Sequence, residues 1–247
     1  MGAAFSVPAP PGTEADDAPM TDPRPIPLPR EAALAALRAT VVGAGIAGLA
    51  TALALGRRGA DVAVLEQAPE IAEVGAGLQI SPNGARVLRA LGMDPAAVGH
   101  RAEAVELRDH HGRLVTRMDL PAEPGFYLCH RADLIGGLEA AARAAGAGVQ
   151  LLQRVSAIEL GERAEAVTRT GARLPAGLLI GADGVHSVLR GALNGPSRPF
   201  FTGQVAWRAT IPGEPGAPVV QVFMWPGRHL VSYPLRGGRL RNLVAVE

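Results

Sequence analysis

The stretch Ala39-Thr40-Val41-Val42-Gly43-Ala44-Gly45-Ile46-Ala47-Gly48 decides the fold of this chain. Its first four residues form a short apolar strand candidate, and an apolar stripe at helical spacing begins at Ile46 and stops at Gly59. A second strand candidate, Asp61 to Glu66, follows at once. A strand, a glycine turn, a helix and a second strand within about 30 residues form a βαβ unit. We therefore expect an α/β fold that opens with a Rossmann-like unit.

The three glycines of this turn follow the G-x-G-x-x-G spacing of dinucleotide-binding proteins. Gly43 permits the tight turn, Gly45 lets the main chain approach a pyrophosphate, and Gly48 lets the helix pack on the sheet. Glu66 ends the second strand, where a carboxylate can accept hydrogen bonds from ribose hydroxyls and would repel a 2′-phosphate. The alternative is a glycine turn that serves packing alone. The turn, the helix stripe and Glu66 in register favour dinucleotide binding, without choosing between NAD and FAD.

Composition excludes several other classes of protein. The 247 residues carry 48% hydrophobic and 19% charged side chains and a net charge of +1, which gives no reason to expect nucleic acid or an anionic membrane as a partner. No stretch reaches the roughly 18 apolar residues of a membrane helix. The single cysteine, Cys129, fits a reducing cytoplasm and excludes a cysteine-ligated metal cluster. We read His110-His111 as a solvated turn, and we expect no metal site and a monomer or homodimer.

Three further motifs identify a family. They are Gly181-Ala182-Asp183-Gly184-Val185-His186-Ser187, where a strand ends and a helix begins; the segment from Glu73 to Gly84; and His130-Arg131-Ala132-Asp133-Leu134. Together with the glycine turn, and in this order, they resemble the flavin-dependent aromatic hydroxylases, the class A monooxygenases that include salicylate and hydroxybenzoate hydroxylases. The likeness extends from about residue 40 to the C-terminus.

The resemblance implies a fold and a reaction. The fold would be like that of para-hydroxybenzoate hydroxylase, a Rossmann-like FAD-binding domain joined to an antiparallel β-sheet substrate domain. FAD would be held without a covalent bond, NADH or NADPH would reduce it, and O₂ would then be used to hydroxylate a small phenolic or aromatic acid. We expect a disordered Pro-rich tail over residues 1–38, the FAD-binding domain with inserted segments over 39–195, and the start of the substrate domain over 196–247, where β-rich runs follow one another.

The resemblance also implies which residues hold the cofactor. The glycine turn would line the pyrophosphate, Glu66 the adenosine ribose, and the segment around Val155 the adenine. Arg131 would reach the pyrophosphate or ribityl chain, and Asp183 would stabilise the site and help the nicotinamide approach. Gln79 and Asn83 would lie at the isoalloxazine edge. The complete set of expected cofactor-binding residues is Gly43, Ala44, Gly45, Ala47, Gly48, Glu66, Gln79, Arg131, Val155 and Asp183.

Three residues of the C-terminal sheet are candidates for the chemistry: His229, Gln204 and Tyr233. His229 and Tyr233 are four residues apart in one expected strand and therefore share a face. The imidazole of His229 suits deprotonation of a phenol near neutral pH, and the alternative is a histidine that only packs in the sheet. Some members of the family carry a histidine where this chain has Gln204, which weakens the case for a base at that position.

The family has a later Gly-Asp element that holds the ribityl chain, and nothing in the sequence matches it. We therefore expect a chain that is incomplete at its C-terminus relative to the family. Two alternatives to the hydroxylase follow. One is a flavin oxidase or epoxidase acting on a non-aromatic substrate, and the other is a nucleotide-binding fragment without catalysis.

Overall fold

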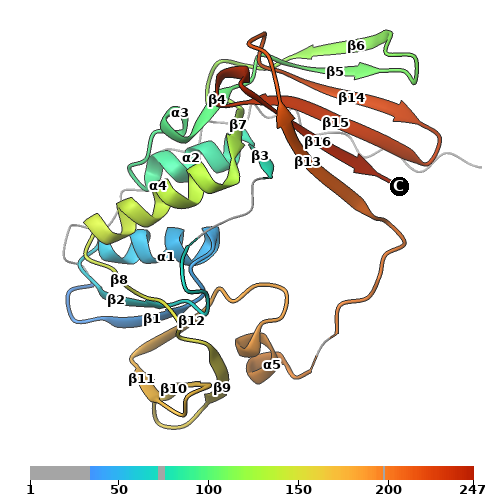
Figure 1. Cartoon of the computed structure of the whole chain (residues 1–247). Helices are drawn as coiled ribbons and strands as arrows, with labels where there is room; N and C mark the ends of the chain where they lie inside the picture. The colour runs from blue at the N-terminus through green and yellow to red at the C-terminus, as the bar shows by residue number, and fades with distance from the viewer. Residues whose placement is uncertain (1–33, 72–75, 197) are drawn as a thin grey trace, which may run out of the picture.

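The structure is a computed structural model that describes residues 34–71, 76–196 and 198–247. The expected tail over residues 1–38 therefore lies almost entirely outside the described residues, as do Glu73, Val74 and Gly75 of the second family motif. Figure 1 shows two bodies, an α/β part and a large, mostly antiparallel sheet, joined on one side by direct packing and on the other by a long segment that leads into β13.

A parallel sheet lies at the centre of the α/β part, with strand order β12-β1-β2-β8. All three of its strand pairs are parallel, so each neighbouring strand must be reached by a crossover connection. The expected βαβ unit is present, with one helix between its first two strands. Its elements and the two outer strands are β1 (Arg38–Val42), α1 (Ile46–Gly56), β2 (Asp61–Leu65), β8 (Gly148–Gln150) and β12 (Leu178–Gly181).

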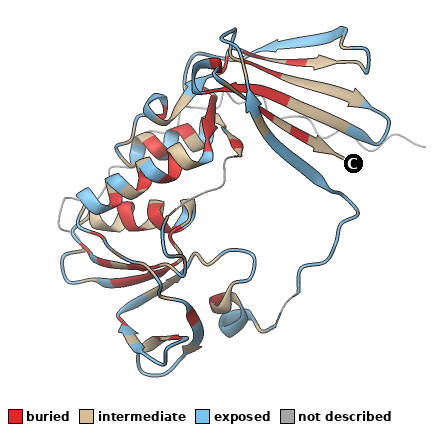
Figure 2. Cartoon of the chain, in the orientation of Figure 1, coloured by how far each residue is buried: buried red, intermediate tan, exposed pale blue. Residues whose placement is uncertain are grey.

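The main core lies between this sheet and the helices above it. Helix α4 (Arg131–Ala144) packs along α1, and Figure 2 shows the buried residues concentrated on their facing sides and on β1 and β2. Leu49 and Val64 from the βαβ unit and Leu138 from α4 are fully buried in this cluster. Burial of such aliphatic side chains is the dominant stabilising contribution, about 1.5–3 kcal/mol for each one.

A second small sheet connects the α/β part to the large sheet. Its order is β3-β7-β4, and both of its pairs are antiparallel. Strand β7 runs directly into α4, so His130 ends the strand and Arg131 begins the helix. The elements of this region are β3 (Gly77–Ile80), α2 (Pro82–Ala90), α3 (Pro95–Val98), β4 (Gly99–Arg101) and β7 (Tyr127–His130).

The large sheet has six strands in the order β13-β16-β15-β14-β5-β6. Its four C-terminal strands lie where the sequence predicts β-rich runs, except that the first begins at Ala206 and leaves Gln204 outside it. The other two strands form a hairpin within residues 103–119, where the alternation around the turn at residues 109–112 predicts one. The sheet therefore draws on both sides of the expected domain boundary at residue 195. The strands are β5 (Ala104–Arg108), β6 (Leu114–Asp119), β13 (Ala206–Pro212), β14 (Val219–Trp225), β15 (Arg228–Leu235) and β16 (Leu240–Val246), with a short 3-10 turn, η1 (Arg236–Gly238), before the last.

One sequence expectation needs correction. Residues 149–160 are predicted as one strand, but the chain forms β8 and then β9, with a turn between them. Leu152 lies in this turn with φ 58°, and Gln153 donates its main-chain N–H to the carbonyl of Glu66. A regular strand cannot contain a left-handed residue, so the pairing direction changes here. A fourth sheet has three strands in the order β11-β10-β9, and a short helix follows it. These elements are β9 (Val155–Glu159), β10 (Ala164–Thr168), β11 (Arg173–Ala176) and α5 (Val188–Asn194).

Candidate functional site

The glycine turn between β1 and α1 is shaped by close packing at two of its three glycines. Gly43 has φ 103°, and a Cβ there would collide with the carbonyl oxygen of Ala182, which follows β12. A Cβ at Gly48 would collide with the carbonyl oxygen of Gly43. Both positions therefore need glycine for the protein's own packing, whether or not a ligand binds.

Gly45 differs from the other two glycines. Its φ of −74° is available to any residue, and a Cβ there would meet no protein atom within 4 Å. It is the N-cap of α1, which has no side-chain cap hydrogen bond and no acidic residue in its first turn. Free main-chain N–H groups at a helix N-terminus bind anions, and pyrophosphate is a common one. The open side of Gly45 is therefore the place in this turn where a phosphate group fits.

Glu66 lies beside the same turn, one residue after the end of β2. Its Oε2 accepts a hydrogen bond from the main-chain N–H of Ala44 at 2.7 Å, and its Oε1 accepts one from Ala68 at 2.8 Å. These contacts fix the carboxylate at the mouth of a cavity of about 140 Å³. The cavity is lined by Ala44, Gly45, Glu66, Ala68, Glu70, Ile71 and Ile135. An acidic side chain held beside the second glycine is what recognition of a ribose requires.

The remaining expected contacts of the nucleotide vary in their surroundings. Ala47 is exposed on the first turn of α1, and Ala44 is buried. Val155 is 8% exposed and packs with Val42 and Leu65 in a second core cluster. Its side chain is therefore occupied in the core, and only the main chain of this segment remains for an adenine.

Asp183 caps helix α5. Its Oδ2 accepts the main-chain N–H of Val188 at 2.7 Å, and its Oδ1 accepts the hydroxyl of Ser187 at 2.6 Å. Ser187, the N-cap residue, in turn accepts the N–H of Arg190 at 2.9 Å, so both side chains hold the first turn of α5. The preceding residue, Ala182, packs against Gly43 and donates its N–H to the carbonyl of Val42 at 2.8 Å. Asp183 therefore fixes the segment that lies against the glycine turn.

A cavity of about 340 Å³ lies where the α/β part meets the large sheet, and we call it the junction cavity. Its lining comes from the first residue of α1, the start of β3, the first residue of α4 and one strand of the large sheet, namely Ile46, Ala76, Gly77, Leu78, Arg131 and Arg208. Two arginines from different parts of the molecule, Arg131 on α4 and Arg208 on β13, therefore line one cavity. The main-chain N–H of Arg131 also donates to the carbonyl of Ala76 at 3.0 Å, which ties α4 to the β3 segment. The exposed Gln79 lies two residues after Gly77 on β3.

The sequence reasoning missed Arg208. It pairs with Val244 on β16 and lies on the same face of the sheet as Asn242, two residues away on that strand. Asn242 is completely buried and accepts a hydrogen bond from Gly77, so this face is the one turned toward the α/β part. Alternation along the strand could have identified Arg208, if the inward face had been known from the sequence.

The three candidates for the chemistry are not brought together. Tyr233 is 2% exposed and lies against Gly77 at the junction, and burial raises the pKa of its hydroxyl to about 12. His229 shares that face, but lies about 13 Å further along the strand at 3.3 Å per residue. Gln204 is exposed before β13 begins. His229 lies beside a shallow hollow of about 500 Å³, together with Trp207, Trp225, Arg228, Leu230, Ala245, Val246 and Glu247.

Comparison with known proteins identifies the family of this chain. The family described as "FAD binding domain" matches residues 36–214, a range that contains the glycine turn, Glu66, Arg131 and Asp183. The chain belongs to this FAD-binding family. FAD is its cofactor, and the residues fit it: the turn has an open cradle at Gly45, an uncapped helix N-terminus and a fixed carboxylate one strand away.

Relatives of the FAD-binding family are similar over most of this chain. A 3-amino-4-hydroxybenzoate 2-monooxygenase of Streptomyces cremeus is 40% identical over 85% of the chain and 56% of its own length. A 3-hydroxybenzoate 6-hydroxylase of Polaromonas naphthalenivorans is 38% identical over 83% of the chain and 55% of its own length. The structure of Klebsiella pneumoniae HpxO with FAD and uric acid is similar with a TM-score of 0.76 and 27% identity, over 85% of the chain and 56% of that protein. The chain thus spans little more than half the length of these relatives.

The described residues contain neither a candidate metal cluster nor a candidate membrane-spanning helix. No group of three or more His, Cys, Asp and Glu among them could hold a metal ion. Within the same ranges, none of the helices combines the length and the apolar character that a membrane span requires.

Proposed function

We propose that the protein is an FAD-dependent monooxygenase that hydroxylates a small aromatic acid with NADH or NADPH and O₂. The observation that carries this proposal is the junction cavity, because the FAD-binding turn and an arginine of the large sheet both border it. Relatives with at least 38% identity are hydroxylases of hydroxybenzoates, which supports a substrate with a carboxylate and a ring hydroxyl.

The residues have separate tasks in this proposal. The N–H groups at the start of α1 and the carboxylate of Glu66 bind the pyrophosphate and the adenosine ribose, and Arg131 binds on the flavin side. FAD held by these residues would supply the redox chemistry that links NAD(P)H and O₂ to the substrate. One oxygen atom enters a ring C–H bond and the other leaves as water, with NAD(P)H and one proton consumed.

Arg208, which lines the junction cavity, orients the substrate. A guanidinium is suited to a carboxylate because it can donate two parallel hydrogen bonds. Tyr233 is 2% exposed and lies outside the lining of this cavity, so its part in the chemistry stays a prediction. His229 and Gln204 stay predictions. His229 would accept the phenol proton only if the ring lies toward its end of the strand.

The experiment uses the full chain with added FAD. NADH and NADPH oxidation is followed with and without 3-hydroxybenzoate, and the product is analysed by mass spectrometry under ¹⁸O₂. We expect oxidation to rise with the aromatic acid and one labelled oxygen to enter the product. Arg208→Gln should raise KM for the acid about 10-fold or more while FAD affinity stays unchanged. Peroxide formation without a labelled product would instead indicate an oxidase, and FAD binding without nicotinamide oxidation would leave only a binding module.

Two further properties belong to this proposal. We propose a cytoplasmic location, supported by the single cysteine, which is buried and has no disulfide partner. We propose a monomer or homodimer with no nucleic-acid partner, supported by a net charge of +1.

A further inference from the structure

Strand β3 has one edge paired and one edge held by a side chain. Gly77 is paired with His130 of β7, and its own N–H points away from that strand. It donates at 2.7 Å to Oδ1 of Asn242, which lies 165 residues later on β16. The side-chain amide of Asn242 therefore supplies the acceptor that a neighbouring strand would otherwise provide. We call this the Gly77–Asn242 contact.

The residues that form the contact are buried. Asn242 is 0% exposed, and Tyr233, its cross-strand partner on β15, is 2% exposed. A Cβ at Gly77 would lie 2.7 Å from Cγ of Asn242 and 2.8 Å from the ring and hydroxyl of Tyr233. Only glycine allows the amide and the phenol to approach the main chain of β3 this closely.

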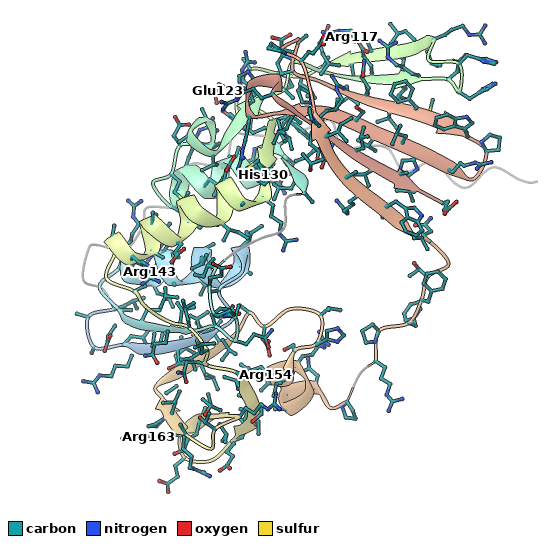
Figure 3. The ribbon with its side chains drawn as sticks, viewed as in Figure 1. Arg117, Glu123, His130, Arg143, Arg154 and Arg163 are labelled. Atoms are coloured by element: carbon teal, nitrogen blue, oxygen red, sulfur yellow. The ribbon has the colours of Figure 1, made fainter. Side chains whose placement is uncertain are left out.

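The junction also holds unused buried polar atoms. Nδ2 of Asn242 and Nδ1 of His130 are the two buried side-chain nitrogen or oxygen atoms among the described residues that have no hydrogen-bond partner. His130 is the residue paired with Gly77, and Figure 3 shows it at the end of α4 nearest the large sheet. A buried unsatisfied donor is costly, but an apolar side chain at position 242 would leave the buried N–H of Gly77 without its acceptor instead. The hydrogen bond to Gly77 is therefore what Asn242 contributes at this place.

The hydrogen bond from Gly77 to Asn242 matters because of where Gly77 lies. Gly77 and Leu78 line the junction cavity, and the expected flavin-edge residue Gln79 follows them. Arg208 also lines the cavity and shares its sheet face with Asn242. We propose that Asn242 is a positioning residue that sets the distance between the β3 wall of the cavity and the sheet face that bears Arg208. The hydrogen bond itself is independent of catalysis, and its consequence for flavin and substrate rests on the proposed function.

The test compares three variants of the full chain. Asn242→Leu removes the acceptor at similar volume, Asn242→Asp keeps an oxygen at the Oδ1 position, and Leu138→Ala destabilises a fully buried site of α4 as a control. Hydrogen exchange of the peptide that covers residues 76–80 is measured by mass spectrometry without FAD or substrate. We expect about 10-fold faster exchange in Asn242→Leu, near wild-type exchange in Asn242→Asp, and no local change in Leu138→Ala. Unchanged exchange in Asn242→Leu, or an equal rise in the control, would overturn the contact.

A second measurement tests positioning. The visible spectrum of bound FAD and the kinetic constants with 3-hydroxybenzoate are recorded for the same variants. We expect a shifted flavin band and a raised KM in Asn242→Leu, restored in Asn242→Asp and absent in the control. A wild-type spectrum and wild-type KM in Asn242→Leu would overturn the positioning role. If the wild-type chain bound no FAD, the proposed function would fail, whereas the exchange result would still decide whether Asn242 holds Gly77.

Discussion

The main-chain N–H of Ala44 donates a 2.7 Å hydrogen bond to the carboxylate of Glu66, 22 residues later in the chain. The glycine turn and the acidic end of β2 are thus fixed to each other before any nucleotide binds. A site that is already formed loses little conformational entropy on binding. Glu66 therefore shapes the turn, and in the proposed site the same carboxylate binds the ribose.

Replacing Glu66 should weaken FAD binding without unfolding the chain. We expect Glu66→Ala to raise the Kd for FAD by about 10- to 100-fold, since a charge-assisted hydrogen bond contributes about 1.5–3 kcal/mol. The quenching of FAD fluorescence during titration with the protein measures this Kd. Asp61→Ala, at the exposed opposite end of the same strand, is the control and should bind FAD like the wild type. Equal affinity in Glu66→Ala would show that the carboxylate does not contact the nucleotide.

Substitutions at two glycines of the turn should have different effects, one on the stability of the fold and the other on FAD affinity. Gly45→Ala should keep the wild-type melting temperature and lose FAD affinity, because its Cβ would occupy the open side of the turn. Gly43→Ala should unfold at lower temperature or fail to fold, because φ is 103° and the Cβ would collide with Ala182. Differential scanning fluorimetry and FAD titration of both variants test this. A Gly45→Ala protein with wild-type affinity would contradict the proposed place of the pyrophosphate.

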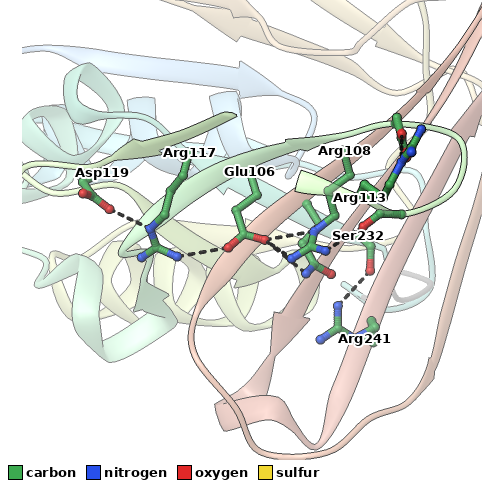
Figure 4. A network of polar contacts seen from close by, with 10 residues as sticks. Glu106, Arg108, Arg113, Arg117, Asp119, Ser232 and Arg241 are labelled. Carbon is green, nitrogen blue, oxygen red and sulfur yellow. Dashed lines mark hydrogen bonds and ion pairs between the residues drawn. The ribbon is translucent and has the colours of Figure 1, made fainter. Parts of the chain in front are cut away.

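The outward face of the large sheet carries a charged network that should make stability depend on pH. Glu106 is 8% exposed and accepts hydrogen bonds from Arg108, Arg117 and Gln221, as Figure 4 shows. The hydrogen bond from Arg108, the largest cause, lowers the pKa of Glu106 below its ordinary value of 4.5. A lowered pKa in the folded state gives stability that is complete above the unfolded pKa and is lost as pH falls through the folded one.

We therefore expect Glu106→Gln to unfold more easily than the wild type by about 1–2 kcal/mol at neutral pH. The difference should shrink as the pH falls below 4.5, the ordinary pKa of the carboxyl. Urea unfolding of both proteins at a series of pH values measures this difference in the free energy of unfolding. Asp119→Asn, at the 81% exposed end of the network, should cost less than about 0.5 kcal/mol. A difference that is constant down to acidic pH would disprove the linkage to this carboxyl.

Cys129 should be unreactive in the folded protein. The thiol is buried, and that burial, with a smaller contribution from the charge of Asp133, raises its pKa to about 12. The thiolate is the reactive form, so a thiol reagent at mildly alkaline pH should label the native chain far more slowly than the unfolded chain. A colorimetric thiol assay with and without denaturant compares the two. Rapid labelling of the native chain would show that the β7 region opens readily.

The sequence predicted the βαβ unit, the hairpin and the last four strands because their apolar periodicity is local. It could not predict that β5 and β6 join the C-terminal sheet, since β5 pairs in parallel with β14 across more than 100 residues. The same limit explains the site. The glycine turn and Glu66 lie within one unit and follow a known spacing, whereas Arg208 and Asn242 reach the junction only through tertiary pairing. The sequence also placed one strand over residues 149–160, because nothing in it marks the left-handed conformation of Leu152.

The most direct test of the account is hydrogen exchange of the turn with and without FAD. Peptides that cover residues 43–49 are compared in the wild-type chain at saturating FAD, with peptides of the outward hairpin β5–β6 as an internal reference. The account predicts strong protection of the turn by FAD and no change in the hairpin. Exchange of the turn that is the same with and without FAD would contradict it.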